Sequence, residues 1–238
     1  MEYALAVHRC DQKKEDIQMI DNVNMEWICK KTPNRLMKIA SWMMHMEEFR
    51  EIEQDEQAVW TLWEPFETVA TSLDVFGERV LTEQLFVISS EFAIQYKKAW
   101  LDLSSITDYP SEPIFKMFEP FIRRIIDDVA RKLYEMKVSK IEEAYMLCQL
   151  AWHLSGKELK RSTIDAGDRF LEEIANDLHE YYMDINLGHY AARLIQLMNI
   201  VNDWKKIFMD RQKVLELAKL FDVFNVVPSE PDLLFYPS

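Results

Sequence analysis

The sequence predicts a single domain built almost entirely of α-helices. Only 4 of its 238 residues are glycine, well below the usual ~7%, so folds that depend on glycine turns or a glycine-rich phosphate loop are disfavoured. Hydrophobic residues make up 49% of the chain, which is enough to build a sizeable core. We expect one domain over residues 1–238, with residues 1–14 as a flexible lead-in.

The N-terminal half shows three helical patterns and one segment typical of strands. Residues 15–31 carry apolar residues at helical spacing. Thr32-Pro33 then either starts a new helix or kinks one long helix. Further helices are predicted from Leu36 to about Glu48 and over 54–73, with Pro65 bending the second. Residues 75–92 contain the first glycine and β-branched runs, which predicts a short β-hairpin.

The C-terminal half is predicted to contain four helices. Residues 104–113 are rich in Ser and Pro and form the clearest loop of the sequence. Beyond this loop, helical patterns cover about 114–137, 139–154, 162–185 and 189–219. Gly156 stands where a C-cap glycine is common, and Gly188 separates the last two helices.

Charge and cysteine usage exclude several classes of protein. The 28 basic and 41 acidic residues give a formal net charge of −13, which disfavours direct binding to nucleic acid or to an anionic membrane. Cys10, Cys29 and Cys148 lack the spacing of a disulfide framework or a zinc module. The longest run without a charged residue, Ala144–Gly156, is too short to span a membrane. The N-terminus has no signal-peptide core.

Catalytic and metal-binding motifs find no support in the residues. Asp127-Asp128 resembles the start of the magnesium-binding motif of all-α prenyl-chain enzymes, but Arg131 stands where a further carboxylate is needed. No histidine has a glutamate three positions before it, so a di-iron site is not encoded. We therefore expect no enzyme activity, no cofactor and no metal, with the acidic pair on a solvated helix face.

Apolar residues in 189–208 alternate at spacings of four and three, which predicts a coiled-coil-like seam along one helix. The seam either packs against helices of its own domain or forms the surface of a dimer. The residues predicted for this dimer helix are Tyr190, Leu194, Leu197, Val201 and Trp204.

The segment 42–60 resembles the signature of nuclear receptor ligand-binding domains. The positions that match or are conservatively replaced are Trp42, Phe49, Ile52, Glu56 and Gln57, with the spacing preserved. FLEEIANDLHEYYM (170–183) and YAARLIQLMNIV (190–201) resemble the ninth and tenth helices of this family, in its large nematode branch. The resemblance covers residues 15–238.

The resemblance implies a three-layer antiparallel helical sandwich with a small β-element. It also implies a nuclear, ligand-regulated transcription factor that binds coregulators and forms a homodimer or a receptor heterodimer. The family's DNA-binding module is a separate cysteine-rich zinc domain, which we expect to be absent from these 238 residues because their three cysteines are scattered. The chain is then either a fragment or a receptor without that module. A rival hypothesis is a ligand-independent scaffold on the same fold, with its pocket filled by side chains.

By register from the signature, the pocket for a small apolar ligand is predicted between two helices. Its residues are Met25, Ile28, Cys29, Thr32, Arg35, Leu36, Ile39, Phe66, Val69, Ala70 and Leu73. Arg35 is the cation expected to bind an acidic head group, such as a fatty-acid carboxylate. The alternatives are a surface ion pair for Arg35 and plain core packing for the other residues.

The groove for coregulator helices is predicted next to this pocket. Its residues are Ala40, Met44, Gln54, Gln57, Ala58 and Thr61. The family clamps the partner helix with a lysine at the position of Met44 and a glutamate in the last helix, whereas this chain ends in SEPDLLFYPS. We therefore expect weak binding of Leu-rich coactivator helices.

Overall fold

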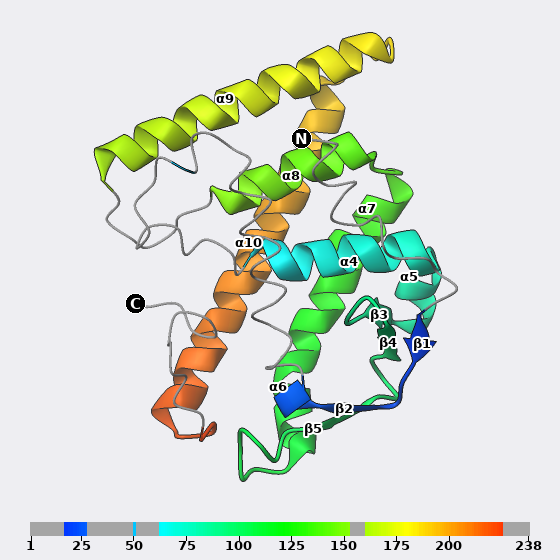
Figure 1. The fold of residues 1–238 in the computed structure, drawn as a ribbon, viewed down its shortest axis with the longest axis vertical. Helices are drawn as coiled ribbons and strands as arrows, with labels where there is room; N and C mark the ends of the chain where they lie inside the picture. Colours follow the sequence, from blue (N-terminus) through cyan, green and yellow to red (C-terminus); the bar gives the residue numbers. More distant parts are fainter. Residues whose placement is uncertain (1–16, 28–49, 51–61, 153–159, 226–238) are drawn as a thin grey trace.

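The computed structural model describes residues 17–27, 50, 62–152 and 160–225. Within these ranges the fold is mostly helical, with two small sheets (Figure 1). The helices are α4 (Trp63–Phe76), α5 (Arg79–Glu83), α6 (Ser111–Arg124), α7 (Arg131–Glu135), α8 (Lys140–Ala151), α9 (Arg161–Asp184) and α10 (Ala191–Leu220). The strands are β1 (Gln18–Met19), β2 (Asn22–Asn24), β3 (Leu85–Val87), β4 (Phe92–Gln95) and β5 (Trp100–Asp102).

The helices form two crossing layers. In Figure 1, α4, α8 and α9 run across the view, whereas α6 and α10 run along its vertical axis. α8 contacts α4, α9 and α10, and α6 contacts α10. The predicted all-α fold with a small β-element is confirmed, and the described helices supply two layers of the expected sandwich.

α8 forms the centre of the hydrophobic core. It begins with a capping box, in which the Ser139 hydroxyl accepts from the Glu142 backbone N–H and the Glu142 carboxylate accepts from the Ser139 N–H. Met146, Leu147 and Cys148 are completely buried. A helix that is buried on nearly every side must be covered by neighbours on all of them, and the contacts with α4, α9 and α10 provide this cover.

The predicted helices of the C-terminal half are confirmed, with ends that shift by a few residues. The pattern over 114–137 begins at Ser111 and continues through a π-helical segment (Ile125–Ala130) into α7. The pattern over 54–73 corresponds to α4 in the described residues. Because Pro65 lies in the first turn of α4, where backbone N–H groups have no helical partner, it does not interrupt the helix.

The prediction of a helix over 15–31 is wrong for its first part, which contains β1 and β2 instead. β1 pairs in parallel with β4, and β2 pairs in parallel with β5. Backbone hydrogen bonds thus join segments that lie about 75 residues apart in the chain. The Val23 side chain in β2 is buried, with 3% exposure. Met25 to Trp27 are helical, and residues 28–31 lie outside the described residues.

The predicted hairpin is present but lies further along the chain. β3 and β4 pair antiparallel, with Phe86 opposite Ile94. Residues 75–83 belong instead to the end of α4 and to α5. Gly77 ends α4 with φ +56°, a left-handed conformation in which glycine is favoured because it lacks a side chain.

Candidate functional site

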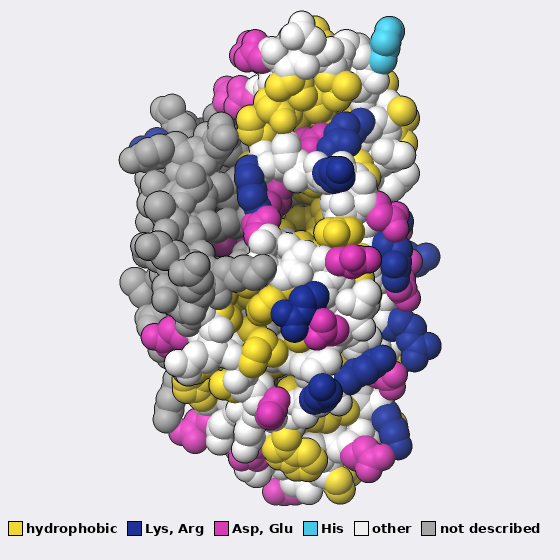
Figure 2. Space-filling model, turned by 90° about the vertical axis from the view of Figure 1, so that its right-hand side faces the viewer, with side chains coloured by type: hydrophobic (Ala, Val, Ile, Leu, Met, Phe, Trp, Pro, Cys, Tyr) yellow, Lys and Arg dark blue, Asp and Glu magenta, His cyan; other side chains and the backbone are white. Residues whose placement is uncertain are grey.

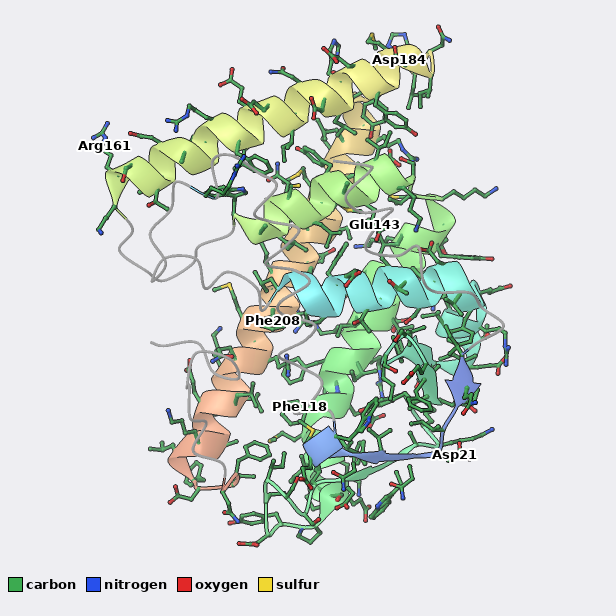
Figure 3. All side chains as sticks on the ribbon, viewed as in Figure 1. Asp21, Phe118, Glu143, Arg161, Asp184 and Phe208 are labelled. Carbon is green, nitrogen blue, oxygen red and sulfur yellow. The ribbon has the colours of Figure 1, made fainter. Side chains whose placement is uncertain are left out.

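A cavity of about 430 Å³ lies between α6 and α10, and residues of α4, of the strands and of loops complete its described lining. α6 and the residue after it contribute Ile114, Phe115, Phe118, Phe121, Ile122 and Ile125, and α10 contributes Trp204, Ile207, Phe208, Arg211 and Leu215. The remaining described lining residues are Met25, Pro65, Tyr96, Leu101, Leu103, Ile106 and Phe224. Figure 3 labels Phe118 and Phe208, which come from the two facing helices.

The helical repeat explains why these residues share the cavity. On α6 the lining positions recur every three or four residues, and on α10 they do the same, so each helix turns one face to the cavity. Two ion pairs join these helical segments: Arg124 to Asp210 at 2.9 Å, and Lys132 of α7 to Asp203 at 2.6 Å. The spacing of the cavity walls is therefore set by packing and by these partly exposed links.

A thin wall separates the cavity from a surface hollow of about 330 Å³. Tyr96, Phe115 and Ile122 line both spaces. The rings of Tyr96 and Phe115 meet edge to face, with their centroids 6.3 Å apart. Burial raises the pKa of Tyr96, and the nearby Glu119 adds to this, so the tyrosine stays neutral at pH 7.

The lining is almost purely apolar. Among the described lining residues, Arg211 is the one charged side chain and Tyr96 carries the one hydroxyl. The outer surface is different: Figure 2 shows Lys and Arg side chains lying among Asp and Glu side chains over one face of the molecule. A mostly apolar concave site with few polar groups is typical of small-molecule binding.

Some of the predicted pocket residues can be placed, and Met25 lines the cavity. Phe66, Val69 and Ala70 are buried in the core, and Leu73 packs against it, all outside the described cavity lining. Phe66 packs behind the cavity wall: its ring lies edge to face with that of the lining residue Trp204, with the ring centroids 5.3 Å apart. A role for Phe66, Val69, Ala70 and Leu73 in ligand binding stays a prediction.

Other predicted site residues lie outside the described residues. These are the pocket residues Ile28, Cys29, Thr32, Arg35, Leu36 and Ile39, and the groove residues Ala40, Met44, Gln54, Gln57, Ala58 and Thr61. The sequence reasoning did not select Arg211. The signal that could have found it is its position seven after Trp204 and three after Phe208, on the apolar face of a predicted helix.

The seam predicted on the last helix is buried within its own chain. Leu197, Val201 and Trp204 are at most 1% exposed, and the indole N–H of Trp204 donates to the Leu62 carbonyl at 2.9 Å. Tyr190 and Leu194 are half-buried and pack against the core. The predicted intramolecular alternative therefore describes Leu197, Val201 and Trp204, because their face of α10 packs toward α8 and is not available to a second copy. A role for the half-buried Tyr190 and Leu194 in a dimer stays a prediction.

The acidic pair has the structural role expected from its sequence. The Asp127 carboxylate accepts from Arg131 at 3.1 Å, and Asp128 lies 4.0 Å from Arg124. In the described ranges, three or more potential ligands (His, Cys, Asp or Glu) are nowhere grouped as a metal ion requires. Likewise, none of the helices described is long and apolar enough to cross a membrane.

A buried carboxylate links three helices near the centre of the fold. Glu142 of α8 accepts from Tyr182 of α9 at 2.7 Å and from the Arg193 guanidinium of α10, also at 2.7 Å. Burial alone would raise the pKa of Glu142, but Arg193, the Ser139 N–H and the Tyr182 hydroxyl outweigh it and lower that pKa. These three side chains lie outside the described cavity lining, and their contacts join α8, α9 and α10.

Comparisons with known proteins agree with this architecture. A family model for the ligand-binding domain of nuclear hormone receptors matches residues 13–221. Nuclear hormone receptor family member nhr-213 of Caenorhabditis elegans is 36% identical over 239 residues, which cover 98% of this chain and 58% of that protein. Family member nhr-54 of the same organism is 33% identical over 206 residues, covering 81% and 49%. The chain thus spans about half the length of these curated relatives.

A solved structure shows the same fold at low identity. The Ultraspiracle ligand-binding domain from Drosophila melanogaster superposes with a TM-score of 0.59, covering 87% of this chain and 78% of that chain. Its sequence identity is 13%, so the likeness concerns the fold alone.

Proposed function

Because this chain belongs to the family of nuclear hormone receptor ligand-binding domains, we propose that it binds a small apolar ligand and thereby regulates transcription. Family members are transcription factors rather than enzymes, so no catalytic role is assigned. One observation carries the proposal: the cavity of about 430 Å³ between α6 and α10 is lined almost wholly by apolar side chains. Volumes of about 300–1,000 Å³ are usual for small-molecule sites.

The burial of the surrounding core supports a preformed site. Trp204 and Ile207 line the cavity and are at most 2% exposed, and Phe121 is 8% exposed. Aromatic rings supply much of the lining and offer large apolar contact areas. A fatty acid or another lipid-like molecule fits this chemistry.

A neutral solvatochromic dye, Nile red, tests the cavity directly. We expect its fluorescence to rise and saturate on titration with the purified chain. Ile106→Trp should weaken this binding at least tenfold, because Ile106 lines the cavity and the indole occupies its space. The matched control is Ile164→Trp on α9, where the side chain is 47% exposed and outside the cavity lining.

The rival function is a ligand-independent scaffold that dimerises or recruits partners with a filled pocket. Native mass spectrometry of the purified chain separates the two. A co-purified lipid that is lost in Ile106→Trp supports the receptor, whereas bare protein that also fails to bind Nile red supports the scaffold. The open volume between α6 and α10 favours the receptor.

The remaining functions follow as proposals from the family. We infer action in the nucleus, coregulator binding at the predicted groove, and dimerisation with a second copy or another receptor. Because the buried seam of α10 is unavailable, its exposed face is the candidate surface, where Ile195 is 62% exposed beside Gln196 and Asn199. Changing Gln196 and Asn199 to Glu should convert a dimer to a monomer in analytical ultracentrifugation. A wild-type monomer at high micromolar concentration would refute this surface.

A further inference from the structure

The surface hollow of about 330 Å³ on the outer side of the cavity wall presents aromatic surface to solvent. Tyr96 and Phe115 form part of the side that it shares with the cavity. Trp100 of β5 also lines the hollow, and 60% of this residue is exposed. A ligand in the hollow would cover part of this indole, which is favourable because it removes apolar surface from water.

The charged side chains of the hollow leave one cation unpaired. Its described lining contains three basic and two acidic residues. On α6, Lys116 binds Glu112 at 2.7 Å, and Arg123 binds Glu119 at 3.2 Å. The remaining cation is Lys97, which is exposed and has no ion pair or hydrogen bond through its ammonium group within the part of the chain that the structure describes. The hollow therefore favours a ligand with an anionic group, although the chain as a whole is acidic.

Gln84 adds an acceptor without a donor. Its backbone carbonyl accepts from the Tyr96 N–H at 2.9 Å, which holds the residue beside the hollow that both line. Its side-chain oxygen is buried and accepts no hydrogen bond from the described residues. A buried polar atom without a partner is costly. Because the side chain as a whole is half-buried and its terminal torsion has broad minima, the amide can turn toward the hollow and accept from a ligand.

We propose that this hollow is a second ligand site, which binds a flat aromatic carboxylate with a hydrogen-bond donor on its ring. The ring stacks on Trp100, the carboxylate binds the Lys97 ammonium group, and the ring donor binds the side-chain oxygen of Gln84. A volume of about 330 Å³ is near the lower end of the usual range for ligand sites, which suits one ring or two fused rings. The site is distinct from the apolar cavity and does not depend on the function proposed for it.

Three related ligands test the predicted contacts. Indole-3-acetate carries the flat ring, the ring N–H and a carboxylate that is ionised at pH 7.5. Tryptophol replaces the carboxylate with a hydroxymethyl group, and 1-methylindole-3-acetate lacks the ring N–H. Titration of each ligand with the full chain, followed by the NMR line widths of the ligand protons, gives its dissociation constant. We expect indole-3-acetate to bind about three- to fivefold more tightly than either analogue, and equal binding of all three would overturn the proposal.

Substitutions assign these contacts to residues of the hollow. Lys97→Gln should remove the preference for indole-3-acetate over tryptophol, whereas Lys98→Gln, at the next exposed lysine and outside the hollow lining, should retain it. Trp100→Ala should weaken all three ligands by about fivefold or more. Its matched control is Tyr109→Ala, which removes an aromatic side chain of a residue that is 53% exposed and outside the lining. If Lys97→Gln or Trp100→Ala leaves binding unchanged, the assignment is refuted.

A last comparison separates this site from the apolar cavity. Ile106 lines the cavity and not the hollow, so Ile106→Trp should bind indole-3-acetate with wild-type affinity. In wild-type protein, saturating indole-3-acetate should leave Nile red bound, which is a measurement independent of variant folding. Displacement of Nile red, or loss of indole-3-acetate in Ile106→Trp, would place the acid in the cavity and refute the second site. If indole-3-acetate binds but Nile red does not, only the proposed function fails.

Discussion

Replacing Glu142 with glutamine tests how strongly one buried carboxylate holds α8, α9 and α10 together. The Glu142 side chain is 1% exposed and accepts from Arg193, Tyr182 and the Ser139 N–H. Arg193 also donates to the Met136 carbonyl at 3.1 Å. Glutamine keeps the shape and an acceptor oxygen, but it removes the charge that faces the guanidinium.

The expected cost follows from the burial of this pair. Removing one partner of a buried ion pair typically costs about 3–5 kcal/mol. Because the Arg193 side chain retains 28% exposure to water, we expect Glu142→Gln to lower the free energy of unfolding by about 3 kcal/mol. For a chain of this length that corresponds to a fall in Tm of about 6–12 °C.

Urea unfolding followed by circular dichroism measures this effect. The matched control is Glu112→Gln, which breaks a Lys116 ion pair whose side chains are 70% and 75% exposed. That change should leave stability unaltered, because exposed pairs contribute little. A loss below about 1 kcal/mol in Glu142→Gln would refute the reasoning.

The pH dependence gives a second check on the same carboxylate. Its pKa is lowered in the folded state, so its contribution to stability is fully present above the unfolded-state pKa of about 4.3 and is lost as pH falls through the folded-state pKa. The stability difference between wild type and Glu142→Gln should therefore be constant near neutral pH and shrink in acid. A difference that grows in acid would contradict the assigned direction.

Two further predictions concern a close helix approach and the coregulator groove. A Cβ atom at Gly167 would lie 2.8 Å from the Trp152 ring, so Gly167→Ala should cost about 1–3 kcal/mol by overpacking, measured by urea unfolding. Gly188→Ala, with open space around it, should show no such loss, and equal stability of both variants would contradict the contact. Met44→Lys should strengthen binding of a fluorescent Leu-rich coactivator peptide by about two- to fivefold, because the resemblance to the family predicts a lysine at this position that binds the C-terminal end of the peptide helix. Tight wild-type binding unaffected by this change would refute the missing clamp.

Local pattern determined the helical architecture of the C-terminal half. In α8, α9 and α10 the apolar periodicity is long and its ends are marked by polar or turn residues, so the predicted boundaries lie within about three residues of the observed ones. The segment 42–60 similarly indicated the family, because it preserves spacing along one stretch of chain. Both kinds of signal are local, and a sequence displays them directly.

Tertiary structure decided the identity of the N-terminal strands and of the cavity lining. Gln18–Met19 forms a strand because β4 supplies its backbone partners, and apolar spacing alone did not distinguish this from a helix. The lining combines one face of α6 with one face of α10, which lie some 90 residues apart in the chain. The charge of Arg211 is visible in the sequence, but its place at the cavity wall depends on how α10 packs, and the pairing of Glu142 with Arg193 depends on the same docking. Sequence therefore determined which helices form, and packing determined which of their side chains meet, because contacts between distant segments arise only when the helices dock.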